Sequence, residues 1–217
     1  MYNITSFCVS FIFPWGLKIK KFLLTLLLSL SLMGCAISPS YSPIREVSYV
    51  VSVGFGQGSG TLIAENRILT AAHVVDGDVN IAIGPKKIPA KVIKIDVEND
   101  LALLETQMGC PCVPVAFKAP QIDDQITVVG FPMFEAANVQ MATHGRVQGT
   151  PEPHLMAMDV NIAPGNSGGG VFQSIGGEWY LVGVAVQVVN AGFGYGLLTY
   201  MSRAVNHKTI KQFLKGT

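Results

Sequence analysis

The chain has 217 residues and a net charge of +1, which suffices for one compact two-lobed domain once a leader is set aside. Its 15 lysines and arginines nearly balance its 14 aspartates and glutamates, and the body holds no basic cluster, so no nucleic-acid partner is expected.

The N-terminal segment is predicted to direct export. Lys18-Ile19-Lys20-Lys21 precedes an apolar run over residues 22–32, and this pairing is typical of an export signal. The run is too short to span a membrane comfortably. Leu32-Met33-Gly34-Cys35 follows and resembles a bacterial lipoprotein signal, which implies cleavage before Cys35 and lipid attachment to it. We therefore expect an exported protein of the cell envelope, anchored by lipid on the periplasmic or extracytoplasmic face.

Alternatives to this leader are an uncleaved anchor and an ordinary secretory signal. Export signals begin with their charged part, whereas residues 1–16 precede it here, and one explanation is a translation start downstream of Met1, for example at Leu17. On this basis residues 1–35 are assigned to the leader, 36–45 to a linker and 46–217 to the folded domain, with lobes over about 46–108 and 120–202.

Short strands separated by turns are predicted through the first lobe. They are Tyr49–Phe55, Gly60–Ala64, Arg67–Thr70, Val79–Ile83, Ile88–Ile95 and Leu101–Glu105. The glycine run over residues 54–60 lacks the dinucleotide-binding spacing and no helix follows it, so no cofactor is implied.

His73 is the histidine best placed for catalysis. Two apolar runs bracket a polar turn at residues 65–67, as in a β-hairpin, and the second run leads through Thr70 to His73. The remaining histidines of the body, His144, His154 and His207, are interpreted as core or surface groups.

Asp100 is the predicted partner of His73. It opens an apolar strand, where an orienting carboxylate would be shielded from water. Asp76, Asp78 and Asp96 compete with it but lie in polar runs typical of solvated loops.

A proline-rich crossing between the lobes is predicted over Gly109–Ala119, and it holds Cys110 and Cys112. This spacing is too tight for a relaxed disulfide, so free thiols and a strained bridge both stay open. A metal site would need two further ligands nearby, and no second soft-ligand cluster exists, so no metal is expected.

The second lobe also consists of short predicted strands. They are Gln125–Gly130, Thr143–Gln148, Met156–Val160, Gly170–Gln173, Tyr180–Val188 and Tyr195–Tyr200. A helix is predicted over Arg203–Lys215, because its apolar residues fall near one helical face. Many short strands with glycine turns favour a barrel or sandwich over a parallel sheet.

Ser167 lies between glycines in the stretch 163–170, where the backbone can turn sharply and present its own N–H groups. The N–H groups of Gly165 and Ser167 are the predicted oxyanion donors. Ser174 and Ser202 lack glycines on both sides and are weaker candidates. The order His73, Asp100, Ser167 is the order of acyl-transfer triads found on two-barrel β folds.

These motifs resemble those of the trypsin-like serine peptidases, and within them the bacterial HtrA/Deg-type protease domain. The matching segments are Gly58-Ser59-Gly60-Thr61, Leu69 to Val75, Asn99 to Leu103 and Asp159 to Gly169. The resemblance extends from residue 47 to residue 204. It implies the chymotrypsin fold, an all-β arrangement of two six-stranded antiparallel β-barrels with a short C-terminal helix.

The resemblance also implies a serine endopeptidase acting on polypeptide substrates. His73 would take the Ser167 proton during attack and return it to the leaving amine, while Asp100 orients the imidazole. Asn166 stands where zymogen-type relatives carry an aspartate, so activation by insertion of a new N-terminus is not expected.

Specificity is predicted from the same resemblance. The predicted substrate pocket is lined by Asn161, Ile162, Ala163, Val184, Ala185, Val186, Gln187 and residues 192–196. None is an acid, so a small or medium apolar side chain is expected at the cleavage point. The residues after Ser167 suffice only for the second barrel, so no PDZ domain and a monomer are expected. The rival interpretations are a lipid-anchored, catalytically latent binding protein and an esterase using the same triad.

Overall fold

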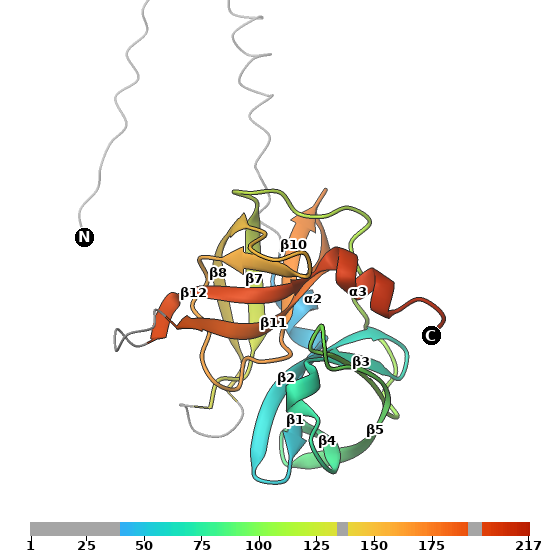
Figure 1. The fold of residues 1–217 in the computed structure, drawn as a ribbon. Helices are drawn as coiled ribbons and strands as arrows, with labels where there is room; N and C mark the ends of the chain where they lie inside the picture. The colour runs from blue at the N-terminus through green and yellow to red at the C-terminus, as the bar shows by residue number, and fades with distance from the viewer. Residues whose placement is uncertain (1–39, 134–138, 191–196) are drawn as a thin grey trace, which may run out of the picture. The chain divides into compact units, whose positions relative to one another are not determined.

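The computed structural model describes residues 40–133, 139–190 and 197–217, and these residues form two antiparallel β-barrels (Figure 1). The first barrel comprises β1 (Ser48–Val53), β2 (Gly56–Ala64), β3 (Arg67–Thr70), β4 (Val79–Ile83), β5 (Lys86–Asp96) and β6 (Leu101–Glu105). The second comprises β7 (Gln125–Gly130), β8 (Met141–Gly149), β9 (Leu155–Met158), β10 (Gly170–Ile175), β11 (Glu178–Asn190) and β12 (Leu197–Asn206).

Both barrels close in the same way. The strand order is β1-β2-β3-β6-β5-β4 in the first and β10-β11-β12-β9-β8-β7 in the second. Short helical segments complete the described chain: α2 (Ser42–Glu46), the 3-10 turn η1 (Ala72–Val74) and α3 (His207–Phe213). The predicted all-β fold of two six-stranded antiparallel barrels with a short C-terminal helix is therefore confirmed. No helix in the described part of the chain is long and apolar enough to cross a membrane.

The β2–β3 hairpin turns at the predicted polar residues. Asn66 adopts a φ of +60°, a conformation that asparagine tolerates better than most residues. Its side-chain oxygen accepts a hydrogen bond from Met108 N at 2.8 Å, and its own N–H donates to Met108 O at 2.8 Å. The turn is thereby fixed to the segment that follows β6.

The helix predicted over Arg203–Lys215 begins later than expected. Strand β12 continues to Asn206 because it is paired on both sides, with β9 and β11, and its residues Ala204 and Val205 are fully buried there. Asn206 then caps α3, since its side-chain oxygen accepts a hydrogen bond from Thr209 N at 3.1 Å. Pairing with two neighbouring strands therefore keeps residues 203–206 extended, although their apolar pattern favours a helix.

The crossing between the barrels is bonded to each of them in turn. Val113 N donates to Leu62 O of β2 at 3.1 Å. Next along the chain, Ala116 N donates to Leu181 O of β11 at 2.9 Å. Cys110 and Cys112 form a disulfide, one of the two possibilities open from the sequence.

One hydrophobic cluster contains residues from both barrels. Leu62, Ile68 and Leu104 represent the first barrel, and Phe172 and Leu181 the second. A further cluster fills the second barrel alone. Because they share a core, the two barrels hold the residues between them in fixed positions.

Candidate active site

His73 lies on η1, directly after β3 leads the chain out of the first barrel. Asp100 binds it at two points: Oδ1 accepts from His73 N at 2.9 Å, and Oδ2 lies 2.7 Å from Nδ1. A carboxylate next to Nδ1 holds that nitrogen protonated and leaves Nε2 as the acceptor. The side chains are 48% and 30% exposed, so the pair is open to solvent on one side.

The hydrogen bond that the His73 ring donates to Asp100 is the largest influence on the His73 pKa and raises it above 6.5. Desolvation by partial burial opposes this shift, and the charge of Asp100 adds to it. The imidazolium is therefore stabilised by its carboxylate partner, as a base that must hold a proton transiently requires.

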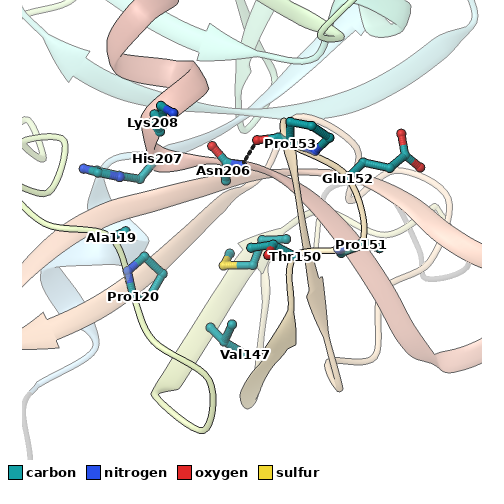
Figure 2. A pocket seen from close by; sticks show the side chains of 11 residues that line it. Ala119, Pro120, Val147, Thr150, Pro151, Glu152, Pro153, Asn206, His207 and Lys208 are labelled. Atoms are coloured by element: carbon teal, nitrogen blue, oxygen red, sulfur yellow. Dashed lines mark hydrogen bonds between the residues drawn. The ribbon is translucent and has the colours of Figure 1, made fainter.

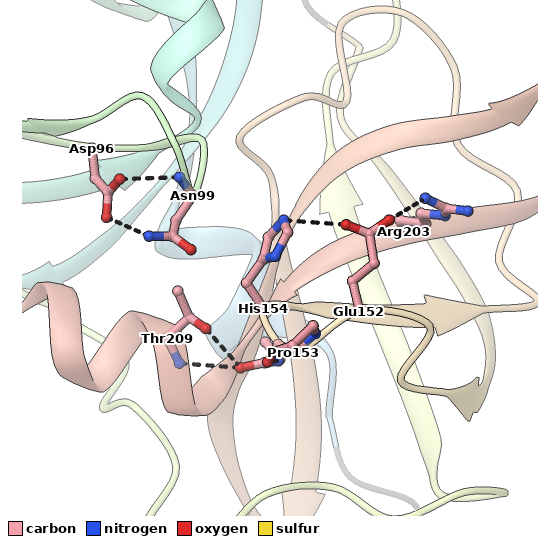
Figure 3. Close-up of polar contacts among 8 residues, drawn as sticks. Asp96, Asn99, Glu152, Pro153, His154, Arg203 and Thr209 are labelled. Atoms are coloured by element: carbon pink, nitrogen blue, oxygen red, sulfur yellow. Dashed lines mark hydrogen bonds and ion pairs between the residues drawn. The ribbon is translucent and has the colours of Figure 1, made fainter.

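Asp100 owes its position to the turn before β6. It adopts a φ of +55°, and the preceding turn is closed by Asp96, whose carboxylate accepts from Asn99 N at 3.0 Å and from Asn99 Nδ2 at 2.8 Å (Figure 3). Of the competing carboxylates, Asp96 is thus engaged in the turn itself. Asp76 and Asp78 are exposed on the stretch between η1 and β4.

A tight turn leads into the candidate nucleophile. Ala163 O accepts a hydrogen bond from Asn166 N at 3.0 Å, and Gly165 has a φ of +96°. With Pro164 at the second position and a positive φ at the third, this is a type II turn. A Cβ at Gly165 would lie 2.5 Å from Phe131 O, so the turn excludes any side chain there.

This turn leaves the predicted oxyanion donors available. Asn166 N and Gly168 N are both bonded to backbone carbonyls. Between and beside them, Gly165 N and Ser167 N donate to no acceptor among the described residues. Available N–H groups on one turn are what a developing oxyanion needs.

The nucleophile loop, residues 163–170, is docked on the first barrel next to the segment that leads to His73. Ser59 N donates to Ser167 O at 2.7 Å. A Cβ on Gly168 would lie 2.2 Å from Thr70 Oγ1, at the end of the strand that leads to η1. Within the described residues no hydrogen bond joins the Ser167 and His73 side chains, and such bonds are often long until substrate binds.

The predicted substrate-pocket residues differ in their exposure. Asn161 and Gln187 are exposed, Ala163 and Val186 are half-buried, and Ile162, Val184 and Ala185 are buried. The Val184 side chain belongs to the core cluster that contains Phe172, so only its backbone can border a substrate. The predicted lining residues 192–196 and the predicted lipidation site Cys35 lie outside the described residues.

Two cavities bordered by described residues lie away from this loop. One of about 420 Å³ is bordered by Pro120, Val147 and Asn206, whose side chain donates to Pro153 O at 2.9 Å (Figure 2). A larger one of about 880 Å³ lies between the turn before β6 and α3. No group of three or more histidine, cysteine, aspartate or glutamate side chains in the described ranges is placed to hold a metal ion.

The other histidines of the body have separate surroundings. His144 Nδ1 lies 3.0 Å from Thr127 Oγ1, and His154 Nε2 lies 3.9 Å from Glu152 Oε2 (Figure 3). His207 begins α3, and burial followed by the charge of Lys211 lowers its pKa below 6.5, while the Ala116 backbone opposes this. None of these contacts involves the nucleophile loop.

The residues that brace the nucleophile loop are not among the predicted site residues. Ser59 Oγ donates to Gly165 O at 2.7 Å, and Met133 N donates to Pro164 O at 2.9 Å. Ser59 lies in the Gly-Ser-Gly motif, so a signal was present for it. Nothing in the sequence marks Met133.

The sequence is similar to those of known serine proteases. The family model of the trypsin-like peptidase domain matches residues 58–184. The chloroplastic Protease Do-like 2 of Arabidopsis thaliana is 31% identical over 147 residues, which are 60% of this chain and 24% of that protein. A serine protease of Mycobacterium tuberculosis is 28% identical over 153 residues, which are 63% of this chain and 38% of that protein.

Solved structures share the fold. The active form of that M. tuberculosis protease superposes with a TM-score of 0.67 at 19% identity, covering 82% of this chain and 86% of the other. A serine endoprotease of Yersinia pestis gives a TM-score of 0.67 at 22% identity, covering 81% and 65%. The similarity to Protease Do-like 2 agrees with the HtrA/Deg-type resemblance of the motifs. The chain spans only about a quarter to two-fifths of the length of the curated relatives described above.

Proposed function

Because the chain belongs to the trypsin-like peptidase family, we propose that it is a serine endopeptidase with His73, Asp100 and Ser167 as its catalytic residues. The observation that carries this proposal is the two-point attachment of His73 to Asp100, at 2.9 Å and 2.7 Å. It fixes the imidazole with Nε2 free to accept a proton. The nucleophile loop is bonded to β2, which pairs with β3, the strand that leads to His73.

The reaction follows from these positions. Ser167 Oγ attacks the peptide carbonyl carbon as its proton passes to His73 Nε2, and the carbonyl oxygen becomes an oxyanion held by Gly165 N and Ser167 N. The C–N bond then breaks, and His73 gives the proton to the leaving amine. Water, deprotonated by His73, cleaves the resulting acyl-enzyme and regenerates Ser167.

The preferred substrate has a small or medium apolar side chain at the cleavage point. Ile162 and Ala185 supply buried apolar surface beside the loop, and Ala185 is bonded to it through both its N–H and its C=O. Neither Asn161 nor Gln187 carries a charge that would select an arginine or a lysine.

Fluorophosphonate labelling of the full chain tests the catalytic proposal. We expect one label per molecule in the parent and in Ser174→Ala, a half-buried serine of β10 outside the loop. Ser167→Ala and His73→Ala should take no label. A folded parent that takes no label and cleaves no casein would contradict the proposal and would favour a catalytically latent binding protein.

We also infer an envelope location with a lipid on Cys35. Support comes from the sequence: the lysines of residues 18–21, an apolar run over 22–32 and Leu32-Met33-Gly34-Cys35. Labelled palmitate fed to expressing cells should enter the parent but not Cys35→Ala. If neither protein incorporates palmitate, mass spectrometry of the N-terminus distinguishes the alternatives. Cleavage at another position would favour an ordinary secretory leader, and no cleavage would favour an uncleaved anchor.

A further inference from the structure

We propose that Ser59 is a positioning residue that keeps the oxyanion donors of the nucleophile loop available, an inference that rests on the proposed function. Ser59 is fully buried in β2 of the first barrel, whereas the loop it contacts belongs to the second barrel. No substrate reaches its side chain, so it acts through the loop.

The loop is held by its carbonyl groups. The carbonyls of Pro164, Gly165, Asn166 and Ser167 each accept one hydrogen bond, from Met133 N, Ser59 Oγ, Gly169 N and Ser59 N respectively. Ser59 alone therefore supplies half of these bonds, both at 2.7 Å.

Fixing a carbonyl also fixes the N–H on the same peptide. In a trans peptide the C=O and the N–H point in opposite directions. The Pro164 carbonyl is held by Met133, which directs the Gly165 N–H away from Met133. The next peptide joins Gly165 to Asn166. Its carbonyl accepts from Ser59 Oγ and its N–H donates to Ala163 O, so the peptide cannot rotate and place its carbonyl against the free oxyanion donors.

The Ser59 hydroxyl accepts one hydrogen bond and donates another, and its partners fix which is which. Phe131 N donates to Ser59 Oγ at 2.9 Å, which makes the oxygen an acceptor on that side. The hydroxyl's own proton therefore lies on the bond to Gly165 O. Removing the hydroxyl leaves a buried carbonyl and a buried N–H without partners, and turning the Gly165 peptide is one way to relieve this.

Ser59 also joins the loop to the strand that carries His73. Thr70 Oγ1 donates to Ser59 O at 2.7 Å, three residues before the histidine. The same residue thus contacts the oxyanion turn and the nucleophile through its hydroxyl and N–H, and the base segment through its carbonyl. Small displacements of Ser59 would change the relative position of all three.

The test compares Ser59→Ala with Ser48→Ala in the full chain. Ser48 is a matched control, because it is buried in β1 and its hydroxyl donates to Ile44 O at the same 2.7 Å, away from the loop. The readouts are kcat and KM for peptide p-nitroanilides ending in alanine or valine. Affinity for the matching peptide boronic acid, which forms a tetrahedral adduct, is compared with affinity for the product peptide acid.

We expect Ser59→Ala to lower kcat by roughly 10- to 100-fold, somewhat less than the loss of a whole oxyanion donor, with KM little changed. Boronic-acid affinity should fall by a similar factor while product affinity is kept, because only the adduct needs the donors. Ser59→Cys, which keeps a weak donor in a similar volume, should be intermediate. Ser48→Ala should lower the melting temperature comparably but keep parental kcat.

Two outcomes in an active parent would overturn the role of Ser59 and leave the proposed function standing. The first is parental kcat in Ser59→Ala. The second is an equal loss of kcat, product affinity and stability in Ser59→Ala and Ser48→Ala, which would mean that Ser59 only stabilises the fold. A folded parent without turnover would overturn the proposed endopeptidase activity and this inference with it.

Discussion

At the scale of single residues, the two oxygens of Asp100 have separate partners. Oδ1 accepts from the His73 backbone N–H and Oδ2 faces Nδ1, so both must be acceptors. Asp100→Asn would place an NH₂ group against one of these donors. We expect it to turn the imidazole to the wrong tautomer and lower kcat by about 10⁴-fold, the scale known for this change in a related triad. Steady-state kinetics checks this, and parental kcat would exclude Asp100 as the orienting group.

The pH dependence of activity follows from the raised pKa of His73. The free base is needed for catalysis, so kcat/KM should fall as the pH drops through a value above 6.5. In Asp100→Asn the acidic limb should move to lower pH, because the largest cause of the shift is removed. A pH profile of residual activity measures this, and an unmoved limb would mean that another group controls it.

Stability should respond to the same group in the opposite sense. A folded-state pKa above the unfolded value means that the folded chain binds the proton more tightly. This contribution is complete below pH 6.5 and is lost as the pH rises through the folded-state pKa of His73. The proposed site should thus be most active at a pH where this ion pair stabilises the fold least.

Comparing Gly168 with Gly176 separates two costs of replacing a glycine: the steric clash of a new side chain and the strain of a positive φ. Its φ is +84°, and a Cβ would lie 2.2 Å from both Ser59 O and Thr70 Oγ1. Gly176 has a φ of +65° with nothing within 4 Å of a Cβ. Gly176→Ala should cost about 1–2 kcal/mol for the left-handed backbone alone. Gly168→Ala should add roughly 1–3 kcal/mol for overpacking and abolish activity.

Urea unfolding of both glycine variants measures the difference. Equal losses of stability in Gly168→Ala and Gly176→Ala would mean that the loop can move away from the first barrel at little cost. That result would also weaken the case for a rigidly held nucleophile.

At the scale of elements, Lys94 attaches α3 to the first barrel. Its ammonium group donates to Phe213 O at 2.5 Å and to Lys215 O at 3.2 Å, at the helix end where carbonyls lack partners and a positive charge is favoured. Lys94→Met should therefore destabilise the protein by about 1–2 kcal/mol. Lys91→Met, an exposed lysine on the same strand, is the control and should be near neutral. Equal melting temperatures for both variants would contradict this.

Elements were predictable from the sequence where their signals are local. Strands β3, β4, β6 and β7 occur at the predicted bounds, because a short apolar run and the turn residues beside it are both local to the segment. The start of α3 was wrong by four residues, because Arg203–Asn206 is held by two neighbouring strands that come from earlier in the chain.

The candidate site shows the same division between local and distant information. Each of His73, Asp100 and Ser167 lies in a motif that can be recognised by itself. Ser59 Oγ accepts from Phe131 N and donates to Gly165 O, residues 72 and 106 positions away, and no pattern within one segment encodes these bonds. Sequence patterns therefore supplied the candidate catalytic residues, whereas the contacts that hold them in place required the structure.

At the scale of the whole molecule, the shared core predicts that the barrels unfold together. Phe172 is fully buried in β10, yet it belongs to the cluster that contains Leu62 and Ile68 of the first barrel. A Cβ on Gly170 would meet both the Phe172 ring and Thr61 Oγ1 of β2, so this glycine lies where the barrels touch.

Phe172→Ala should destabilise both barrels by about 3–5 kcal/mol, because it opens a cavity in the core that they share. Native-state hydrogen exchange measures this strand by strand, and the slowest amides of β1–β6 and β7–β12 should lose protection equally. Val182→Ala is a second test, since Val182 is buried in the cluster of the second barrel alone and its truncation should still lower protection in both barrels if they unfold together. A loss confined to β7–β12 in Phe172→Ala would mean that the barrels unfold separately. The triad would then depend on docking of two independently stable halves, because His73 and Asp100 come from one barrel and Ser167 from the other.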